Sequence, residues 1–204
     1  MIKNFADIAF TESVKEQQKL YGSREKYARI ESVERGTELT FAEADFINER
    51  DGFYMATVSE SNFPYVQFRG GEKGFLKTLN SKTLGFADFR GNLQYISVGN
   101  LSVNNRAALI LMDYANRQRL KIWAQIEIIN AADAPELVEK LVVPGYKAKI
   151  ERAMLLHVTA FDWNCPQHIS PRYTETEIRT VVQPLLTKIE KLEAELETYK
   201  RKAN

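Results

Sequence analysis

The sequence predicts a mainly β fold: an antiparallel barrel of about seven strands with a few flanking helices and a helical C-terminal extension. Runs of aromatic and β-branched residues fill region 52–129 and are bounded by Gly, Asn, Ser and Pro, which is typical of strands and turns. The segment Arg119–Ile129 alternates apolar and polar residues with a period of two. Only two or three helices are expected before the extension, which favours an antiparallel barrel over a parallel α/β sheet.

The segment Arg119–Ile129 shows the clearest strand pattern. Its 11 residues are about 36 Å long when extended, long enough to curve around a small barrel. The alternation places one apolar set on the core face, namely Leu120, Ile122, Ala124, Ile126 and Ile128. The other expected strands are Phe53–Val58, Tyr65–Arg69, Leu84–Phe89, Gln94–Val98, Ala107–Tyr114 and Arg152–Trp163.

Helices are expected at three places before the extension. Phe10–Tyr21 and Ala134–Val142 have helical spacing and end at Gly22 and at Pro144-Gly145. Thr40 and Glu43 fit a capping box, which starts a short helix with Phe41, Ala44, Phe46 and Ile47 on its apolar face. The polar segment Arg24–Leu39 is expected to wrap the surface.

The composition changes after Tyr173, so we expect a domain at residues 1–173 and a helical extension at 174–204. Apolar residues of the extension recur at alternating spacings of four and three, as in Ile178, Val182, Leu185, Ile189, Leu192, Leu196 and Tyr199. Pro184 is expected to kink or restart the helix. Two alternatives remain open: the helix packs on its own barrel, or it contacts another subunit.

Composition is ordinary for a globular protein. The 204 residues carry 28 Lys plus Arg against 27 Asp plus Glu, a net charge of +1, which gives no global field for nucleic acid. One cysteine, Cys165, permits no intramolecular disulfide, and no apolar run approaches the ~18 residues of a membrane span. We therefore expect a cytoplasmic protein with neither a nucleic-acid nor a membrane partner.

Glycine-containing turns follow three neighbouring segments of the predicted barrel: Arg69-Gly70-Gly71, Arg90-Gly91-Asn92 and Gly99-Asn100-Leu101. Glycine lets a ligand approach the backbone closely, and an arginine fork suits phosphate. Each turn alone is common, but three within about 35 residues of one meander indicate a binding site. No P-loop, dinucleotide fingerprint or Ser-His-Asp arrangement appears.

The order and spacing of these motifs resemble the pyridoxamine 5′-phosphate oxidase-related FMN-binding split-barrel family over roughly Phe41–Tyr173. The segments that carry the resemblance are Gln67–Gly71, Phe86–Asn92, Ser97–Leu101, Asn105–Leu109, Arg119–Ile122 and Trp163–Tyr173. The resemblance implies a six- to seven-stranded antiparallel split β-barrel. It also implies a homodimer that binds FMN in clefts at the subunit interface.

The resemblance also implies roles for individual residues. Arg69, Ser97 and Asn100 would hold the FMN phosphate, and Arg119 would lie near the pyrimidine edge of the flavin, where a cation stabilises the reduced ring. Trp163 and Gln167 would close the pocket. The remaining expected contacts, along the ring and the ribityl chain or in the flanking turns, are Gln67, Phe68, Gly70, Asp88, Asn92 and Leu101.

The chain departs from the oxidases proper, whose phosphate motif is Ser-Arg-Lys where this sequence has Tyr95-Ile96-Ser97, and it lacks their C-terminal substrate signature. We therefore expect a homodimeric FMN-dependent oxidoreductase of unknown small-molecule substrate. The alternatives are a non-catalytic flavin carrier or sensor, and haem or deazaflavin in the same cleft. His157 and Cys165 are expected to be structural, whereas His168 is a candidate pocket donor; no metal site is expected.

Overall fold

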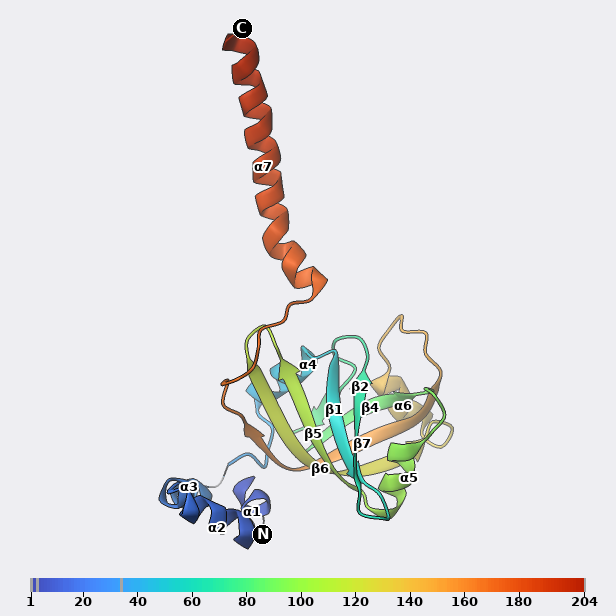
Figure 1. Ribbon diagram of the computed structural model, residues 1–204. Helices are drawn as coiled ribbons and strands as arrows, with labels where there is room; N and C mark the ends of the chain where they lie inside the picture. Colours follow the sequence, from blue (N-terminus) through green and yellow to red (C-terminus); the bar gives the residue numbers. More distant parts are fainter. Residues whose placement is uncertain (1, 3, 34, 204) are drawn as a thin grey trace. The chain divides into compact units, whose positions relative to one another are not determined.

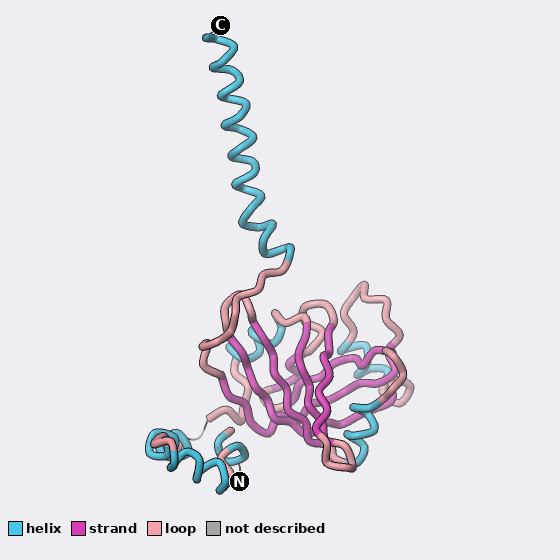
Figure 2. The backbone as a smooth tube through the Cα atoms, in the orientation of Figure 1, coloured by secondary structure: helices cyan, strands magenta, loops and turns pink. Residues whose placement is uncertain are grey.

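The computed structural model describes residues 2, 4–33 and 35–203 and divides into two compact units. The first contains residues 1–113 and 118–166; the second contains 114–117 and 167–204. Figure 1 shows the seven strands of the first unit as one curved sheet, and Figure 2 separates its strands from the helices. The strands are β1 (Gly52–Val58), β2 (Pro64–Gly70), β3 (Lys77–Asn80), β4 (Thr83–Phe89), β5 (Arg106–Asp113), β6 (Gln118–Asn130) and β7 (Ile150–Trp163). The helices are α1 (Ala6–Ala9), α2 (Glu12–Leu20), α3 (Arg24–Glu31), α4 (Phe41–Asn48), α5 (Ile96–Val103), α6 (Pro135–Leu141) and α7 (Glu175–Ala203).

The sheet is antiparallel and open. Its strand order is β2-β1-β5-β6-β7-β4-β3, so β2 and β3 are the two edges. The short β3 pairs only with the first part of β4, up to Gly85, and leaves the end of β4 without a strand neighbour on that side. The expected mainly β, antiparallel split barrel is confirmed, and the split lies beside β2 and the end of β4.

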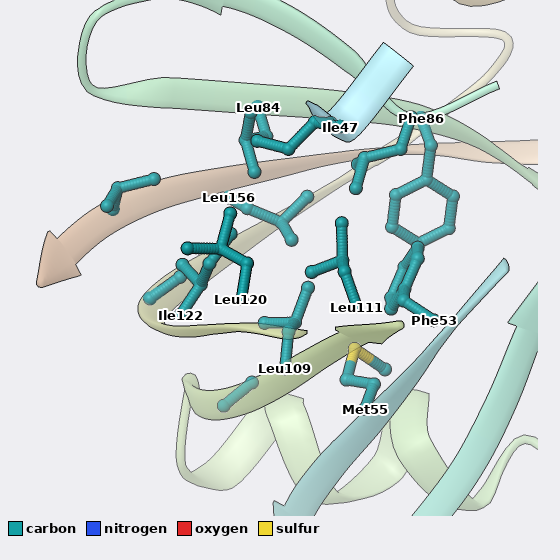
Figure 3. Close-up of a cluster of buried hydrophobic side chains, with 14 of the residues drawn as sticks. Ile47, Phe53, Met55, Leu84, Phe86, Leu109, Leu111, Leu120, Ile122 and Leu156 are labelled. Carbon is teal, nitrogen blue, oxygen red and sulfur yellow. The ribbon is translucent and has the colours of Figure 1, made fainter. Parts of the chain in front are cut away.

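Alternating residues of the strands form the core shown in Figure 3. The apolar face expected for Arg119–Ile129 is confirmed: four of its five residues are buried in this cluster, and Ile128 packs against it partly buried. Burying each large aliphatic side chain contributes roughly 1.5–3 kcal/mol. The largest fully buried side chains of the cluster are Ile47, Phe53, Met55, Leu76, Leu84, Leu109, Leu111, Leu120, Ile122, Met154 and Leu156.

The expected strand Gln94–Val98 is wrong, because this segment leads into helix α5. The short apolar run also satisfies a helical period: Ser97, Asn100 and Leu101 are buried on one face of the helix. A run of five residues cannot distinguish the two periods, and tertiary burial decides between them. The correction matters for function because it places a helix N-terminus where an extended strand was expected.

The polar segment Arg24–Leu39 contains helix α3, which has no buried residue and whose ends are joined by an Arg24–Glu31 ion pair at 2.5 Å. One further expectation, concerning α4, requires correction. Phe41 is 90% exposed although it was placed on the apolar face of α4, whereas Phe46 and Ile47 are buried as expected. Phe41 is the first residue of α4 and lies outside the core. Phe46 and Ile47, more than one turn further along the helix, are the residues that face the core.

The N-terminal helices contact the outer side of the sheet. The Phe5 ring, just before α1, stacks on Trp123 of β6 at a centroid distance of 4.6 Å. The ammonium group of Lys121 lies 4.7 Å from the centroid of the same Phe5 ring. Both contacts involve the wetter face of β6, whose alternation the sequence predicted.

The second unit contains the long helix α7 and the turn Tyr114–Arg117. The guanidinium carbon of Arg172 lies 5.1 Å from the Tyr114 ring centroid. The expected C-terminal helix is confirmed, but it continues through Pro184 without the expected restart. No helix in the described part of the chain combines the length and apolarity that crossing a membrane requires.

Candidate functional site

A polar pocket of about 230 Å³ lies where β2, the end of β4 and the start of α5 meet. It adjoins the open side of the barrel, where β4 has lost its β3 neighbour. Five of the twelve predicted site residues line it, namely Gln67, Arg69, Asp88, Asn92 and Ser97. These five residues thus lie together in one pocket, which we call the split-edge pocket.

An ion-pair network crosses the split at the base of the pocket. Asp88 is 1% exposed and accepts a hydrogen bond from Arg69 Nη1 at 2.5 Å and one from Arg152 Nε at 2.8 Å. Arg152 Nη2 also donates to Glu151 at 2.9 Å. Burial opposes the charge on Arg152, but Asp88 and Glu151 outweigh it and raise the pKa of the guanidinium. Arg152 is therefore held as a cation beside the pocket.

Arg69 retains an unused donor. Its Nε is buried and has no hydrogen-bond partner among the described residues. An unpaired buried donor costs about 1–3 kcal/mol, so Arg69 Nε lacks a partner that would stabilise this arrangement.

The N-terminus of α5 faces the same pocket through Ile96, Ser97 and Val98, its first three residues. No side chain caps it, because the N-cap position is Tyr95 and this residue makes no capping hydrogen bond. An uncapped helix N-terminus carries free amide donors and a partial positive charge. Together with two guanidinium groups it forms a surface suited to an anion.

The loop that precedes α5 contains backbone strain. Leu93 and Tyr95 line the pocket and have positive φ angles of 64° and 52°. Left-handed backbone costs a residue other than glycine roughly 1–2 kcal/mol. Such conformations persist where the surroundings enforce them, often at ligand sites.

Three expected residues of the α5 segment have distinct positions. The Ser97 hydroxyl donates to Gln67 Oε1 at 2.8 Å and joins the helix to β2. Asn100 is buried and donates to Thr57 Oγ1 at 3.0 Å, so it anchors α5 to β1 and does not line the pocket. Leu101 belongs to the hydrophobic core. Ser97 is thus the expected residue of this segment that reaches the pocket, and the other two hold the helix in place.

Phe68 and Gly70 line a smaller neighbouring pocket of about 150 Å³, which shares Gln67, Arg69 and Asp88 with the first. The Phe68 ring is 58% exposed and packs edge-on against Tyr54 at 5.4 Å. A Cβ on Gly70 would lie 2.8 Å from this ring, so the ring requires glycine there.

The last three predicted residues lie outside the split-edge pocket of the single chain. Arg119, at the start of β6, has a buried Nε without a partner among the described residues. Trp163 ends β7 and contacts α4. Gln167 is exposed and belongs to the second unit.

Sequence reasoning missed Arg152, the second cation of the site. Its partner Asp88 is 64 positions away and lies opposite it in the β4–β7 pairing. An arginine in an alternating strand gives no signal of such a contact, which the register alone creates. The other pocket residues, which were not among the predicted site residues, are Tyr65, Phe89, Gly91, Leu93, Gln94, Tyr95, Ile96 and Val98.

Trp163 takes part in a different polar cluster, around the capping box that the sequence predicted. Glu43 is 6% exposed; one of its oxygens accepts from Trp163 Nε1 at 2.7 Å and the other from the backbone and hydroxyl of Thr40, at 2.9 and 2.5 Å. Burial raises the pKa of Glu43, but the hydrogen bonds from Thr40 and Trp163 prevail, and the net pKa is lowered. This cluster lines a pocket of about 620 Å³ with Arg35–Glu38 and Phe161.

Replacing Trp163 by Phe should lower the free energy of unfolding by about 1–2 kcal/mol at pH 7, because the Glu43 carboxylate loses a donor. A lowered folded pKa stabilises the fold above the ordinary glutamate pKa of about 4.3, and this contribution disappears as the pH falls through the folded value. The difference between wild type and Trp163→Phe should therefore shrink in urea titrations below about pH 4. Trp123→Phe is the control, with a difference that does not depend on pH; equal pH dependence of the two variants would contradict the assignment.

The two histidines and the cysteine have separate environments. His157 is exposed, and its Nε2 lies 2.9 Å from Glu127 Oε2. His168 and Cys165 are both exposed, and His168 has a positive φ of 62°. No group of three or more possible metal ligands occurs in the part of the chain that the structure describes.

The fold is an open antiparallel barrel with a polar, arginine-lined pocket at its split. A sequence comparison gives the family to which a chain with this fold belongs. The family model described as pyridoxamine 5′-phosphate oxidase matches residues 39–162, more than half of the chain, so the chain belongs to this family. The predicted resemblance is thereby confirmed. No curated protein matches the chain in sequence.

Solved structures similar to this chain include HupZ of Group A Streptococcus, with 15% identity, coverage of 66% of this chain and 99% of that chain, and a TM-score of 0.49. An FMN-binding protein of Syntrophomonas wolfei is 9% identical, with coverage of 72% and 97% and a TM-score of 0.47. General Stress Protein 26 of Bacillus anthracis is 12% identical, with coverage of 64% and 92% and a TM-score of 0.45. Likenesses at this level do not bear on what the chain binds.

Proposed function

We propose that this protein binds FMN, with the phosphate in the split-edge pocket, and acts as a flavin-dependent oxidoreductase on a small molecule. One observation carries the proposal: the uncapped N-terminus of α5 faces the same pocket as the guanidinium groups of Arg69 and Arg152. The Nε of Arg69, which has no partner among the described residues, would give a phosphate oxygen a donor. Ser97 lines the pocket beside the two arginines, with its hydroxyl proton donated to Gln67 Oε1.

The pocket also accounts for the loss of the Ser-Arg-Lys phosphate motif. The sequence has Tyr95-Ile96-Ser97 at that position and so lacks the local cation. Arg152 lies on β7 and brings a cation to the pocket from another part of the chain. In our proposal the α5 amides, Ser97, Arg69 and Arg152 together replace that motif.

The size of the pocket supports a homodimer with flavin at the subunit interface. Ligand pockets usually measure about 300–1,000 Å³, whereas the split-edge pocket measures about 230 Å³. It suits the phosphate and part of the ribityl chain, where Asn92 and Gln67 offer amide groups. The flavin ring then needs a surface beyond the single chain, and a second subunit would supply it.

A candidate surface for this contact is the outer face of β2, β1 and β5. Phe68 and Ile110 both pair with Tyr54 across the sheet, and Val66 pairs with Ala56. The exposed fractions are 59% for Val66, 58% for Phe68, 40% for Tyr54 and 39% for Ile110. A contiguous apolar patch of this kind marks an interaction site. We propose that two copies join through this face.

Bound FMN would supply the redox chemistry, and the residues of this chain would bind, orient and tune it. In this proposal Arg119 places a cation near the pyrimidine edge of the flavin. Trp163 and Gln167 close the cleft, and because they lie outside the split-edge pocket of their own chain, they do so from the partner subunit. The exposed Phe68 ring offers an apolar surface beside Gly70 for the flavin or for the substrate.

The proposal is tested by titrating the full chain with FMN and with riboflavin, which lacks the phosphate, and following the flavin fluorescence. Charge-assisted hydrogen bonds contribute about 1.5–3 kcal/mol each, so FMN should bind at least about tenfold more tightly. Equal affinities for the two flavins, or no binding of either, would overturn the phosphate site.

We also propose that residues 1–173 form the flavin-binding domain and 174–204 an accessory extension. Deleting residues 187–204 should leave the Kd for FMN within about twofold, because the residues of the split-edge pocket all lie before Ala153. Fluorescence titration of the deletion variant beside the full chain measures this. A deletion variant that folds but no longer binds FMN would show that the extension contributes to the cleft.

A further inference from the structure

Helix α7 carries a continuous apolar stripe that the proposed function leaves unused. It consists of Ile178, Val182, Leu185, Ile189, Leu192, Leu196 and Tyr199, and every member is between 37% and 70% exposed. The remaining side chains of Glu175–Lys202 are exposed as well. The helix spans 29 residues, or about 44 Å. A stripe of this length with a 4-3 spacing requires a partner helix with the same repeat.

We propose that this stripe pairs with the same stripe of a second copy, as a parallel, in-register, two-stranded coiled coil. With Ile189 at heptad position a and Leu192 at position d, the a positions include the β-branched Val182 and Ile189. The third a position is Leu196, and the d positions are Ile178, Leu185, Leu192 and Tyr199. The pattern of a β-branched residue at a and leucine at d therefore holds over residues 182–192. β-Branched residues at a with leucine at d favour parallel dimers over larger bundles.

Charge complementarity identifies the partner as a second copy. In a parallel dimer each g residue meets the e residue five positions later on the other helix. This rule pairs Lys188 with Glu193 of the second copy, and Glu195 with Lys200 of the second copy. The first such pair is apolar, Val181 with Leu186, and widens the seam. Both charged flanking pairs are thus attractive when the helix meets itself.

The position of Pro184 is compatible with this pairing. Pro184 occupies heptad position c, which faces away from the seam, so its ring and its missing amide do not touch the partner. The helix continues through it. On the same outer side, Ala194 occupies position f and is exposed.

Site-specific cross-linking in the full chain tests both the orientation and the register. In a Cys165→Ser background, Leu192→Cys places one thiol at a d position and Ala194→Cys places one on the outer side of the same helix. Residues at d face their own copies in a parallel dimer, within the Cα distance of 4.4–6.8 Å that a disulfide needs. With oxidised glutathione, the Leu192→Cys chain should form a disulfide dimer at least about tenfold faster than the Ala194→Cys chain.

In both variants the helix is joined to the barrel by the same segment. Dimerisation through the barrel would therefore raise the two cross-linking rates equally and would not produce a difference between them. Pairing of the tails does not require bound flavin, so this outcome is separate from the flavin test. Equal rates for the two variants, or an absence of cross-linking in both, would overturn the proposal. In an antiparallel pair, residue 192 would not lie beside residue 192 of the second copy. The Leu192→Cys disulfide would then not form rapidly, which would also overturn the proposal.

Charge reversal provides a second readout that preserves the apolar seam. Lys188→Glu, added to the Leu192→Cys chain, places two carboxylates opposite each other on both sides of the dimer and should slow cross-linking by about two- to fivefold. Adding Glu193→Lys reverses the second partner and should restore the original rate. Failure of the double reversal to restore the rate would contradict the parallel register.

Discussion

Asp88→Asn should lower the free energy of unfolding by about 3–5 kcal/mol, the largest stability effect expected for a single polar substitution in this chain. The Asp88 carboxylate is 1% exposed and compensates Arg69 and Arg152, whose side chains are each 15% exposed. Without it, two nearly buried cations face each other across the split of the barrel. Urea denaturation at pH 7 measures the loss.

The matched control is Asp162→Asn on β7. Its ion pair with Lys121 spans 3.5 Å, with side chains 29% and 37% exposed, so its loss should change stability by less than about 1 kcal/mol. Equal effects of the two substitutions would show that the network at the split does not hold the barrel together.

The same variant should respond more strongly to FMN than wild type does. Asp88→Asn leaves both guanidinium groups available to a phosphate, and a ligand stabilises a protein according to its affinity for the folded state. At equal FMN concentration, the rise in Tm should therefore be larger for Asp88→Asn. A smaller rise would show that the phosphate does not bind beside these arginines.

Arg69→Gln should raise the Kd for FMN about ten- to a hundredfold, because one charge-assisted contact to the phosphate is lost. The Kd for riboflavin should remain within about twofold, since riboflavin carries no phosphate. Fluorescence titration of both ligands separates this local effect from a general loss of folding, which would weaken both.

Lys73→Gln is the control for charge, because Lys73 is exposed and pairs with Glu49 away from the pocket. In the single variant Arg69→Gln, the Asp88 carboxylate loses one of its two arginine partners, and its charge could then repel the phosphate. The double variant Arg69→Gln with Asp88→Asn removes this charge and is the control for that effect. We expect weak FMN binding by the double variant as well. If the double variant bound FMN as tightly as Asp88→Asn alone, Arg69 would have no contact with the phosphate.

Local patterns in the sequence predicted most of the barrel. The alternation at Leu120, Ile122 and Ala124 gave the correct core face of β6, and Thr40 with Glu43 gave the correct start of α4. In both cases neighbouring residues contain the whole signal, through a period of two or through a capping box. The start of α5 was not predictable in this way, because the five-residue segment Gln94–Val98 fits a strand and a helix equally well.

Residues of the candidate site were predictable only where they belong to a sequence motif. Arg69 and Ser97 were found in turn motifs, whereas Arg152 was not, because nothing near it in the chain marks it. Its role arises from the register of β7 against β4 and from the closure that brings β2 to Asp88. Contacts of this kind depend on the whole fold and leave no local pattern.

The central claim is that the split-edge pocket binds the phosphate end of FMN. An absorbance spectrum of the full chain, after incubation with FMN and removal of excess ligand, tests it most directly, before and after dithionite is added under nitrogen. The account predicts flavin absorption bands that remain with the protein and bleach on reduction. A spectrum without retained flavin, or one with the bands of haem or a deazaflavin in the protein as purified, would contradict it.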